Sequence, residues 1–188
     1  MKVNIIIGSF VMLMMLSAAG ASDLSEFPGM FIEDIGANVV VVVGKSAKAE
    51  DVLGAIDIVA SLQYELNKEL GTNKKIDVAR FDTEVLKQDP SLEMNNYITV
   101  GGPCINSVSA RFMGYPDNCM EGFDLGKAWI KLYELGNEHT GMMVAGATAL
   151  DTKRAAYVVS NHGDYEFEGS EMTVSKVNIK DININPVD

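Results

Sequence analysis

Three glycine-containing loops hold the residues of this sequence that are best placed to bind a ligand. Each follows an apolar run and precedes a helical pattern: Gly44-Lys45-Ser46, Gly101-Gly102-Pro103 and Gly146-Ala147-Thr148. In a parallel sheet such loops gather beyond the carboxyl ends of the strands, where ligands usually bind. Backbone amides at three helix starts would favour an anion or a hydroxyl-rich ligand. The candidate binding residues are Gly44, Ser46, Gly101, Gly102, Asn106, Gly146 and Thr148.

A second explanation of these glycines requires no ligand. Glycine permits tight turns and close packing of helices, and such loops accompany every fold of this kind. None of the three loops matches the nucleotide-binding patterns GxGxxG, GxxxxGKS or GxxxxGKT. The sequence therefore predicts no nucleotide cofactor, and both explanations of the glycines stay open.

Residues for catalysis or metal binding do not form a recognisable pattern. The sequence contains neither a GxSxG nor an HExxH motif. His139 lies in a polar turn, and His162 lies near a helix end, where a cation would complement the helix dipole. Asp164, Glu168 and Glu171 could contribute to a calcium site, but no EF-hand pattern surrounds them. We predict no catalytic residues, no metal and no cofactor.

The sequence contains two cysteines, Cys104 and Cys119, and their expected state depends on the cellular compartment of the protein. An even pair in an exported protein favours a disulfide. Closing a loop of about 15 residues would stabilise the fold by roughly 3 kcal/mol in the chain-entropy model. The alternatives are two unpaired thiols or a metal-binding pair that lacks further ligands.

The N-terminal 21 residues have the anatomy of a secretory signal. Lys2 provides a positive start, residues 5–16 are apolar, and Ala19-Gly20-Ala21 places small residues where a signal peptidase cleaves. We expect cleavage after Ala21, with residues 22–188 forming a single domain. The alternative is retention as a membrane anchor, because residues 3–21 approach the length needed to span a bilayer.

The net charge of the chain argues against nucleic acid as a binding partner. The chain has 15 basic and 26 acidic residues, a formal charge of −11, and loss of Lys2 with the signal would make it −12. An acidic surface repels phosphate backbones, so we predict no nucleic-acid partner.

Strand and helix patterns alternate along the chain. Apolar runs at residues 39–43, 97–100 and 142–145 each precede a helical pattern, the first ending at Gly71. Ser46 is expected to cap the first helix, residues 106–113 to form the second, and residues 149–161, capped by Thr148 with Asp151, the third. Repetition of this unit predicts an α/β fold with a mainly parallel, Rossmann-like sheet flanked by helices.

Further strands are expected beside this parallel core. Residues 76–81 fit a strand that returns from the long helix, and residues 128–134 alternate between two faces. The turn at Gly136-Asn137 would join the latter to the strand at residues 142–145 as an antiparallel hairpin. Residues 172–184 also alternate and predict one or two C-terminal edge strands, ended by Pro186.

Four stretches of the sequence resemble the archaeal S-layer protein family. They are VVVVGKSAKAEDVLGAIDIVA at residues 40–60, ITVGGPCINSVSARFMG at 98–114, GFDLGKAWIKLYE at 122–134 and VAGATALDTKRAAY at 144–157. The resemblance spans residues 27–176. It implies an α/β S-layer domain with a structural, non-enzymatic role at the cell surface. Members of that family are usually much longer and commonly glycosylated, whereas this sequence has no Asn-x-Ser/Thr sequon.

The leading hypothesis is therefore a secreted, S-layer or S-layer-associated structural protein. Its expected partners are other envelope or S-layer proteins, copies of itself, and cell-surface glycan. The main alternative is an envelope module that binds a glycan or an anion through the glycine loops. A hydrolase of envelope polymers is a third hypothesis.

Overall fold

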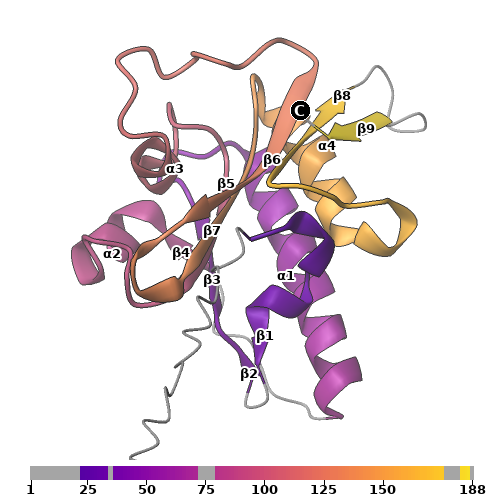
Figure 1. Cartoon of the computed structure of the whole chain (residues 1–188). Coiled ribbons are helices and arrows are strands. Elements are labelled where there is room, and N and C mark those ends of the chain that lie inside the picture. The colour runs from indigo at the N-terminus through magenta and orange to yellow at the C-terminus, as the bar shows by residue number, and fades with distance from the viewer. Residues whose placement is uncertain (1–21, 34–35, 72–78, 176–182, 187–188) are drawn as a thin grey trace, which may run out of the picture.

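The computed structural model describes residues 22–33, 36–71, 79–175 and 183–186. They form a seven-stranded sheet in the order β4-β3-β5-β7-β6-β8-β9, with helices on both faces, and a separate two-stranded hairpin (Figure 1). The α/β class expected from the sequence is confirmed. The expected signal segment, residues 1–21, lies outside the described residues. Within the described part of the chain, no helix is long and apolar enough to cross a membrane.

The parallel half of the sheet contains the three strands that precede the glycine loops. β3 (Val39–Val43), β5 (Asn96–Val100) and β7 (Thr140–Gly146) lie side by side and parallel. β4 (Ala79–Phe81) extends this part at the edge, parallel to β3. Every residue of β3 and β5 is buried, which explains their continuous runs of apolar and β-branched residues. The expected strand at 76–81 is confirmed for residues 79–81, and residues 76–78 lie outside the described residues.

The antiparallel half follows the predicted hairpin. β6 (Lys127–Glu134) pairs with β7 through a turn at Gly136–Glu138. β8 (Glu171–Ser175) pairs with β6, and β9 (Asn183–Pro186) pairs with β8 at the other edge of the sheet. The predictions of a hairpin and of C-terminal edge strands are confirmed, although residues 176–182 lie outside the described residues.

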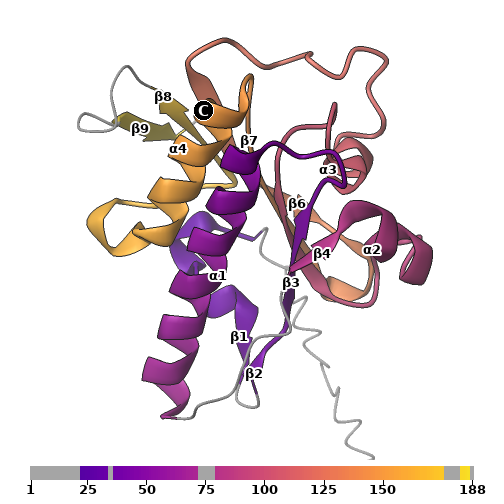
Figure 2. The ribbon, with the colours of Figure 1, turned by 180° about the vertical axis from the view of Figure 1, so that it is seen from behind.

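Two helices cover one face of the sheet. α1 (Ala49–Leu70) and α4 (Ala149–Ser160) run side by side (Figure 2). They approach closely because Gly54 of α1 has no side chain; a Cβ there would lie 2.8 Å from the Cβ of Ala156. The main core between these helices and the sheet includes Val41, Ile58, Leu62, Ile98, Ile130, Val144 and Val159, all fully or almost fully buried.

Two shorter helices cover the opposite face of the parallel strands. α2 (Asp82–Gln88) and α3 (Ser107–Phe112) enclose a smaller core with β3 and β5. Val85 of α2 and Val108 of α3 meet Tyr97 of β5 in this core. The helix α2 was not predicted from the sequence.

The start of α1 differs from the expectation. Its N-cap is Lys48, so the prediction that Ser46 caps this helix was wrong; Ser46 is exposed in the preceding turn. Of the apolar positions expected to face the core, Ala55, Leu62 and Leu66 are buried, whereas Val52 and Ile56 are 39% and 54% exposed. The helix ends as predicted, with Gly71 in a left-handed conformation (φ 59°).

A segment near the N-terminus, for which the sequence analysis predicted no helix or strand, contributes to the main core. It contains short 3-10 turns at Leu24–Glu26 and Gly29–Phe31, followed by a hairpin of β1 (Ile32–Glu33) and β2 (Gly36–Ala37). Its apolar side chains Leu24, Phe27 and Phe31 are buried in the main core.

Candidate functional site

The carboxyl ends of β3, β5 and β7 meet at one edge of the sheet, as predicted, and a pocket of about 180 Å³ lies there. We call it the carboxyl-edge pocket. Its lining comes from the start of α1, the loop after β5, the loop after β7 and the connection between α3 and β6, which arches over this edge in Figure 1. The start of α1 contributes Lys48 and Asp51, and the loop after β5 contributes Gly102, Pro103, Cys104 and Ile105. The loop after β7 contributes Gly146 to Ala149, and the connection before β6 contributes Cys119, Met120 and Phe123.

Asp51 is the buried carboxyl of this pocket. It is the third residue of α1, and its Oδ2 accepts a hydrogen bond of 3.2 Å from the backbone amide of Lys48. The residue is 0% exposed, and its Oδ1 has no hydrogen-bond partner among the described residues. Burial raises the pKa of the Asp51 carboxyl, and the Lys48 amide and the Thr152 hydroxyl offset this only in part. Asp51 thus borders the pocket, but its carboxyl is buried beneath the pocket surface.

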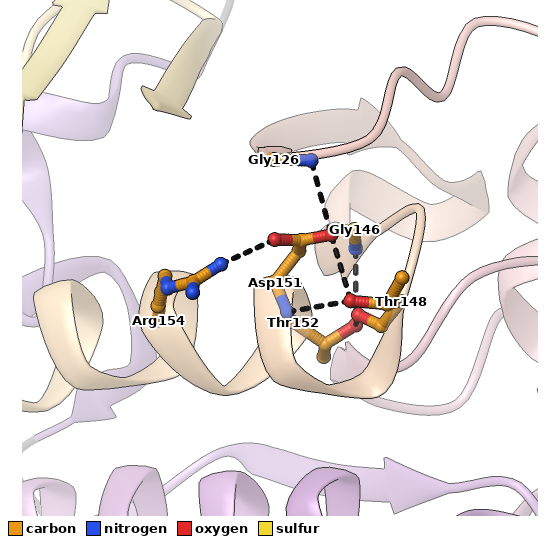
Figure 3. Close-up of polar contacts among 6 residues, drawn as sticks. All are labelled: Gly126, Gly146, Thr148, Asp151, Thr152 and Arg154. Carbon is orange, nitrogen blue, oxygen red and sulfur yellow. Dashed lines mark hydrogen bonds and ion pairs between the residues drawn. The ribbon is translucent and has the colours of Figure 1, made fainter. Parts of the chain in front are cut away.

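The start of α4 forms the opposite side of the pocket and contains several side-chain hydrogen bonds (Figure 3). The hydroxyl of Thr148 accepts a hydrogen bond from the Asp151 amide and donates one of 2.7 Å to Asp151 Oδ2. Asp151 also accepts hydrogen bonds from Arg154 at 2.5 Å and from the Gly126 amide at 3.3 Å. The predicted cap by Thr148 and Asp151 is confirmed. Thr152 accepts a hydrogen bond from the Gly146 amide and thereby fixes the loop after β7.

Asp82 already occupies amides that were expected to attract a ligand. Its carboxylate accepts hydrogen bonds from the backbone amides of Lys45, at 2.8 Å, and Ser107, at 2.9 Å. Burial opposes its ionisation, but these bonds and one from Thr83 outweigh that effect, so the pKa of Asp82 is lowered. The loop after β3 and the start of α3 are therefore tied together by an internal carboxylate.

Asn106 has a similar structural role. Its Nδ2 donates to the carbonyls of Val42, at 3.0 Å, and Val100, at 3.2 Å, which end β3 and β5. Its Oδ1 caps α3 by accepting from the amides of Val108 and Ser109. Asn106 is fully buried and joins two strands to a helix, a role that accounts for all of its polar atoms.

Packing explains two of the four glycines, Gly44 and Gly146, and backbone conformation explains a third, Gly101. A Cβ on Gly44 would lie 1.8 Å from the carbonyl oxygen of Ile105, and one on Gly146 would lie 2.5 Å from the Cβ of Asp151. Gly101 has φ 102°, a conformation that favours glycine. Gly102 differs, since the atom closest to an added Cβ, in the Phe123 ring, is 3.7 Å away.

A disulfide fixes the outer wall of the pocket. The bond between Cys104 and Cys119 confirms the predicted pairing and ties the connection before β6 to the loop after β5. From β6, the indole N–H of Trp129 donates a hydrogen bond of 3.0 Å to the carbonyl of Gly122 in this connection. The next residue, Phe123, lies close to Gly102, since its ring is 3.7 Å from the position of an added Cβ there.

The predicted binding residues fall into two groups. Gly102, Gly146 and Thr148 line the carboxyl-edge pocket, whereas Gly44, Ser46, Gly101 and Asn106 do not. The sequence analysis did not identify Asp51 or Phe123 as pocket residues. A signal existed for Asp51, because it precedes the buried positions Ala55, Ile58 and Leu62 at helical spacing and so continues the buried stripe with a carboxyl.

The remaining polar candidates lie elsewhere. His162 packs edge-on against Phe27, with ring centroids 5.1 Å apart. Glu171 forms an ion pair with Lys131 on the sheet face, beside Trp129 and Tyr133. In the part of the chain that the structure describes, no three His, Cys, Asp or Glu side chains are grouped so that they could hold a metal ion.

Comparisons with known proteins add no assignment. No protein-family model matches this chain, and no curated protein is significantly similar to it.

Proposed function

We propose that this protein is a secreted, non-enzymatic component of the cell surface, either within an S-layer or associated with one. It acts through contacts with other envelope proteins or with copies of itself. The observation that carries the proposal is the disulfide between Cys104 and Cys119. Disulfides persist in oxidising compartments outside the cytoplasm and are rare inside it.

Three sequence features support the same compartment and role. They are the signal-like segment at residues 1–21, the formal charge of −11 and the resemblance to S-layer proteins. An acidic surface suits a protein that meets cations and other proteins instead of nucleic acid.

Fractionation of the native cells tests this proposal. Antibody detection should find the protein in the envelope fraction, and protease added to intact cells should degrade it. A cytoplasmic marker protein in the same sample serves as the control for lysis. Recovery in the soluble cytoplasmic fraction, protected from protease, would contradict the proposal.

A second candidate function is favoured by the carboxyl-edge pocket. An envelope module could hold a small ligand there, against Gly102, Phe123 and Thr148, which line the pocket. Of the glycine loops, those after β5 and β7 take part in this pocket through Gly102 and Gly146. Replacing Gly102 with a bulky residue should abolish binding while the protein stays folded, because an added Cβ makes only ordinary contacts and Gly102 lines the pocket.

A further inference from the structure

The antiparallel strands β6 and β8 have one buried face and one partly exposed face. Their side chains that point to the main core, such as Ile130 and Val174, are buried. On the opposite side of the sheet, α2 and α3 cover β3 and β5, and the side chains of β6 and β8 stay accessible to solvent. We call this surface the open sheet face. It consists of Trp129, Lys131 and Tyr133 of β6 and Glu171, Thr173 and Ser175 of β8.

A pocket of about 150 Å³ lies on the open sheet face, and we call it the sheet-face pocket. Met143 of β7, which is 2% exposed and pairs in register with Lys131, lies at its base. The connection before β6 forms one wall through Gly122 and Phe123. Because the indole N–H of Trp129 is bonded to the Gly122 carbonyl, the ring of Trp129 offers the pocket apolar surface and no free donor.

The polar groups of the pocket are an ion pair. Lys131 and Glu171 are bonded to each other across β6 and β8, and their side chains are 39% and 20% exposed, so a ligand in the pocket can reach them. The ammonium of Lys131 also lies 5.8 Å from the ring centroid of Tyr133. The pair thus presents N–H donors and carboxylate acceptors side by side, next to aromatic rings.

This combination of groups favours a neutral ligand that is rich in hydroxyls. The cores of protein–protein interfaces are depleted in charged residues, whereas Lys131, Glu171 and Glu121 all line this pocket. An anionic polymer would meet a chain with a formal charge of −11, and a cation would meet the ammonium of Lys131. A sugar hydroxyl donates to a carboxylate and accepts from an ammonium, and the apolar face of a sugar ring packs on an aromatic ring.

We propose that the sheet-face pocket binds one ring of a neutral oligosaccharide or polysaccharide, with the ring against the indole of Trp129 and its hydroxyls bonded to Lys131 and Glu171. The volume is below the roughly 300–1,000 Å³ of sites that enclose a drug-sized ligand, which suits one ring of a longer chain. The adjoining rings lie along the open sheet face, where Thr173 offers a further hydroxyl. This site goes beyond the proposed function, because it differs from the carboxyl-edge pocket, although Phe123 lines both.

Fluorescence titration of the purified protein tests this assignment. Trp129 is the single tryptophan of the chain, so its emission reports directly on the pocket. The probes are maltotetraose, cellotetraose, mannotetraose and tetra-N-acetylchitotetraose, with polygalacturonate and free lysine as charged comparisons. At least one neutral tetrasaccharide should shift the emission and protect the indole from acrylamide quenching, with a Kd on the order of 0.1–10 mM because one ring makes few contacts. Polygalacturonate and lysine should leave the emission unchanged.

Two pocket variants and one matched control locate the binding. The double variant Lys131→Ala, Glu171→Ala removes both hydrogen-bonding groups without leaving one charge unpaired, and should weaken binding by about tenfold or more. Trp129→Ala should weaken it at least as much, measured by calorimetry because the fluorophore is lost. Tyr64→Ala removes an aromatic ring that is 65% exposed on α1, outside the pocket, and should leave binding unchanged. The double variant changes partly exposed side chains, so it gives an answer even if Trp129→Ala failed to fold.

Several results would overturn the assignment. They are absence of binding by all four tetrasaccharides, unchanged affinity in both pocket variants, an equal loss in Tyr64→Ala, or binding of polygalacturonate or lysine in place of a neutral sugar. Sedimentation equilibrium adds one more, since a dimer that Trp129→Ala dissociates would show that a second copy of the chain covers the open sheet face. None of these results would affect the location that fractionation measures. A cytoplasmic location with intact sugar binding would instead overturn the surface role alone.

Discussion

Asp51 and Asp151 occupy the same position, the third residue, of two helices that pack side by side, yet only Asp151 has partners for both of its oxygens. Asp151 is bonded to Thr148, Arg154 and Gly126, whereas Asp51 Oδ1 has no partner among the described residues. Both carboxyls are buried. The pair therefore offers a comparison between a carboxyl whose burial is offset by several hydrogen bonds and one whose burial is offset only in part.

Asparagine substitutions should affect these two positions in opposite ways. Asp151→Asn loses charge-assisted hydrogen bonds and should lower the free energy of unfolding by about 1–3 kcal/mol. Asp51→Asn can keep the bond from the Lys48 amide through its Oδ1 and removes a carboxyl whose environment favours the neutral form. Its free energy of unfolding at pH 7 should be unchanged or higher. Urea unfolding of both variants measures the difference, and a loss at Asp51 equal to that at Asp151 would show that Asp51 has a purely structural role.

Asp51 should contribute to the pH dependence of the free energy of unfolding. Burial raises its folded-state pKa above the unfolded value, with Glu50 adding to the rise and Lys48 opposing it. Between these two pKa values the unfolded chain ionises first, so ionisation of Asp51 costs stability as the pH rises through that window. Above the folded pKa the cost is constant.

The measurement is the difference in unfolding free energy between the wild type and Asp51→Asn across pH 3 to 8. Subtraction removes the opposite contributions of Asp82 and Asp89, whose lowered pKa values make stability fall as the pH falls. The advantage of Asp51→Asn should grow with pH from about 3.9, the usual pKa of aspartate, and then level off. An advantage that shrinks with rising pH would contradict the environment described for Asp51.

Two glycine-to-alanine substitutions distinguish a tightly packed glycine from one where a Cβ can be accommodated. Gly44→Ala places a Cβ 1.8 Å from a backbone oxygen of Ile105 and should cost about 1–3 kcal/mol or more, because the backbone must move. Gly102→Ala meets only ordinary contacts at 3.7 Å and beyond, so it should unfold near the wild-type temperature. Equal destabilisation by both substitutions, measured by thermal unfolding, would contradict the ordinary contacts described for a Cβ at Gly102.

Removing the disulfide should loosen the wall of the carboxyl-edge pocket. The bond joins residues 15 apart, and a loop of that size stabilises a fold by roughly 3 kcal/mol in the chain-entropy model. The double variant Cys104→Ser, Cys119→Ser should show this loss. Trp129 is the single tryptophan of the chain and donates to Gly122 in the same connection, so its fluorescence should also change. Unchanged stability and fluorescence would show that the connection is held in place by other contacts.

Local patterns were sufficient to predict most of the fold. The β-branched run of β3, the turn at Gly136 and the Thr148 cap each act on their immediate neighbours, so the sequence specifies them directly. The pairing of Cys104 with Cys119 followed from the small number of cysteines and the expected compartment. Each of these predictions required no knowledge of distant contacts.

The composition of the site depended on contacts that no local pattern contains. The first turns of α1 carry apolar residues on several sides, including the exposed Val52, Leu53 and Ile56, so the spacing that places Asp51 on the buried side was one of several that fitted the pattern. Asp82 reaches the amides of Lys45 and Ser107, 37 and 25 residues away. Only the folded structure shows which backbone amides at the sheet edge are already hydrogen-bonded within the protein and where a pocket is left.

The measurement that tests the surface role most directly is the intact mass of the native protein after alkylation of free thiols without reduction. Protein extracted from the envelope should have the mass of residues 22–188, or of the whole chain if the N-terminal segment is retained. In both cases it should carry no alkyl group, since Cys104 and Cys119 are bonded to each other. Whole-length protein from the cytoplasm with both cysteines alkylated would contradict the account.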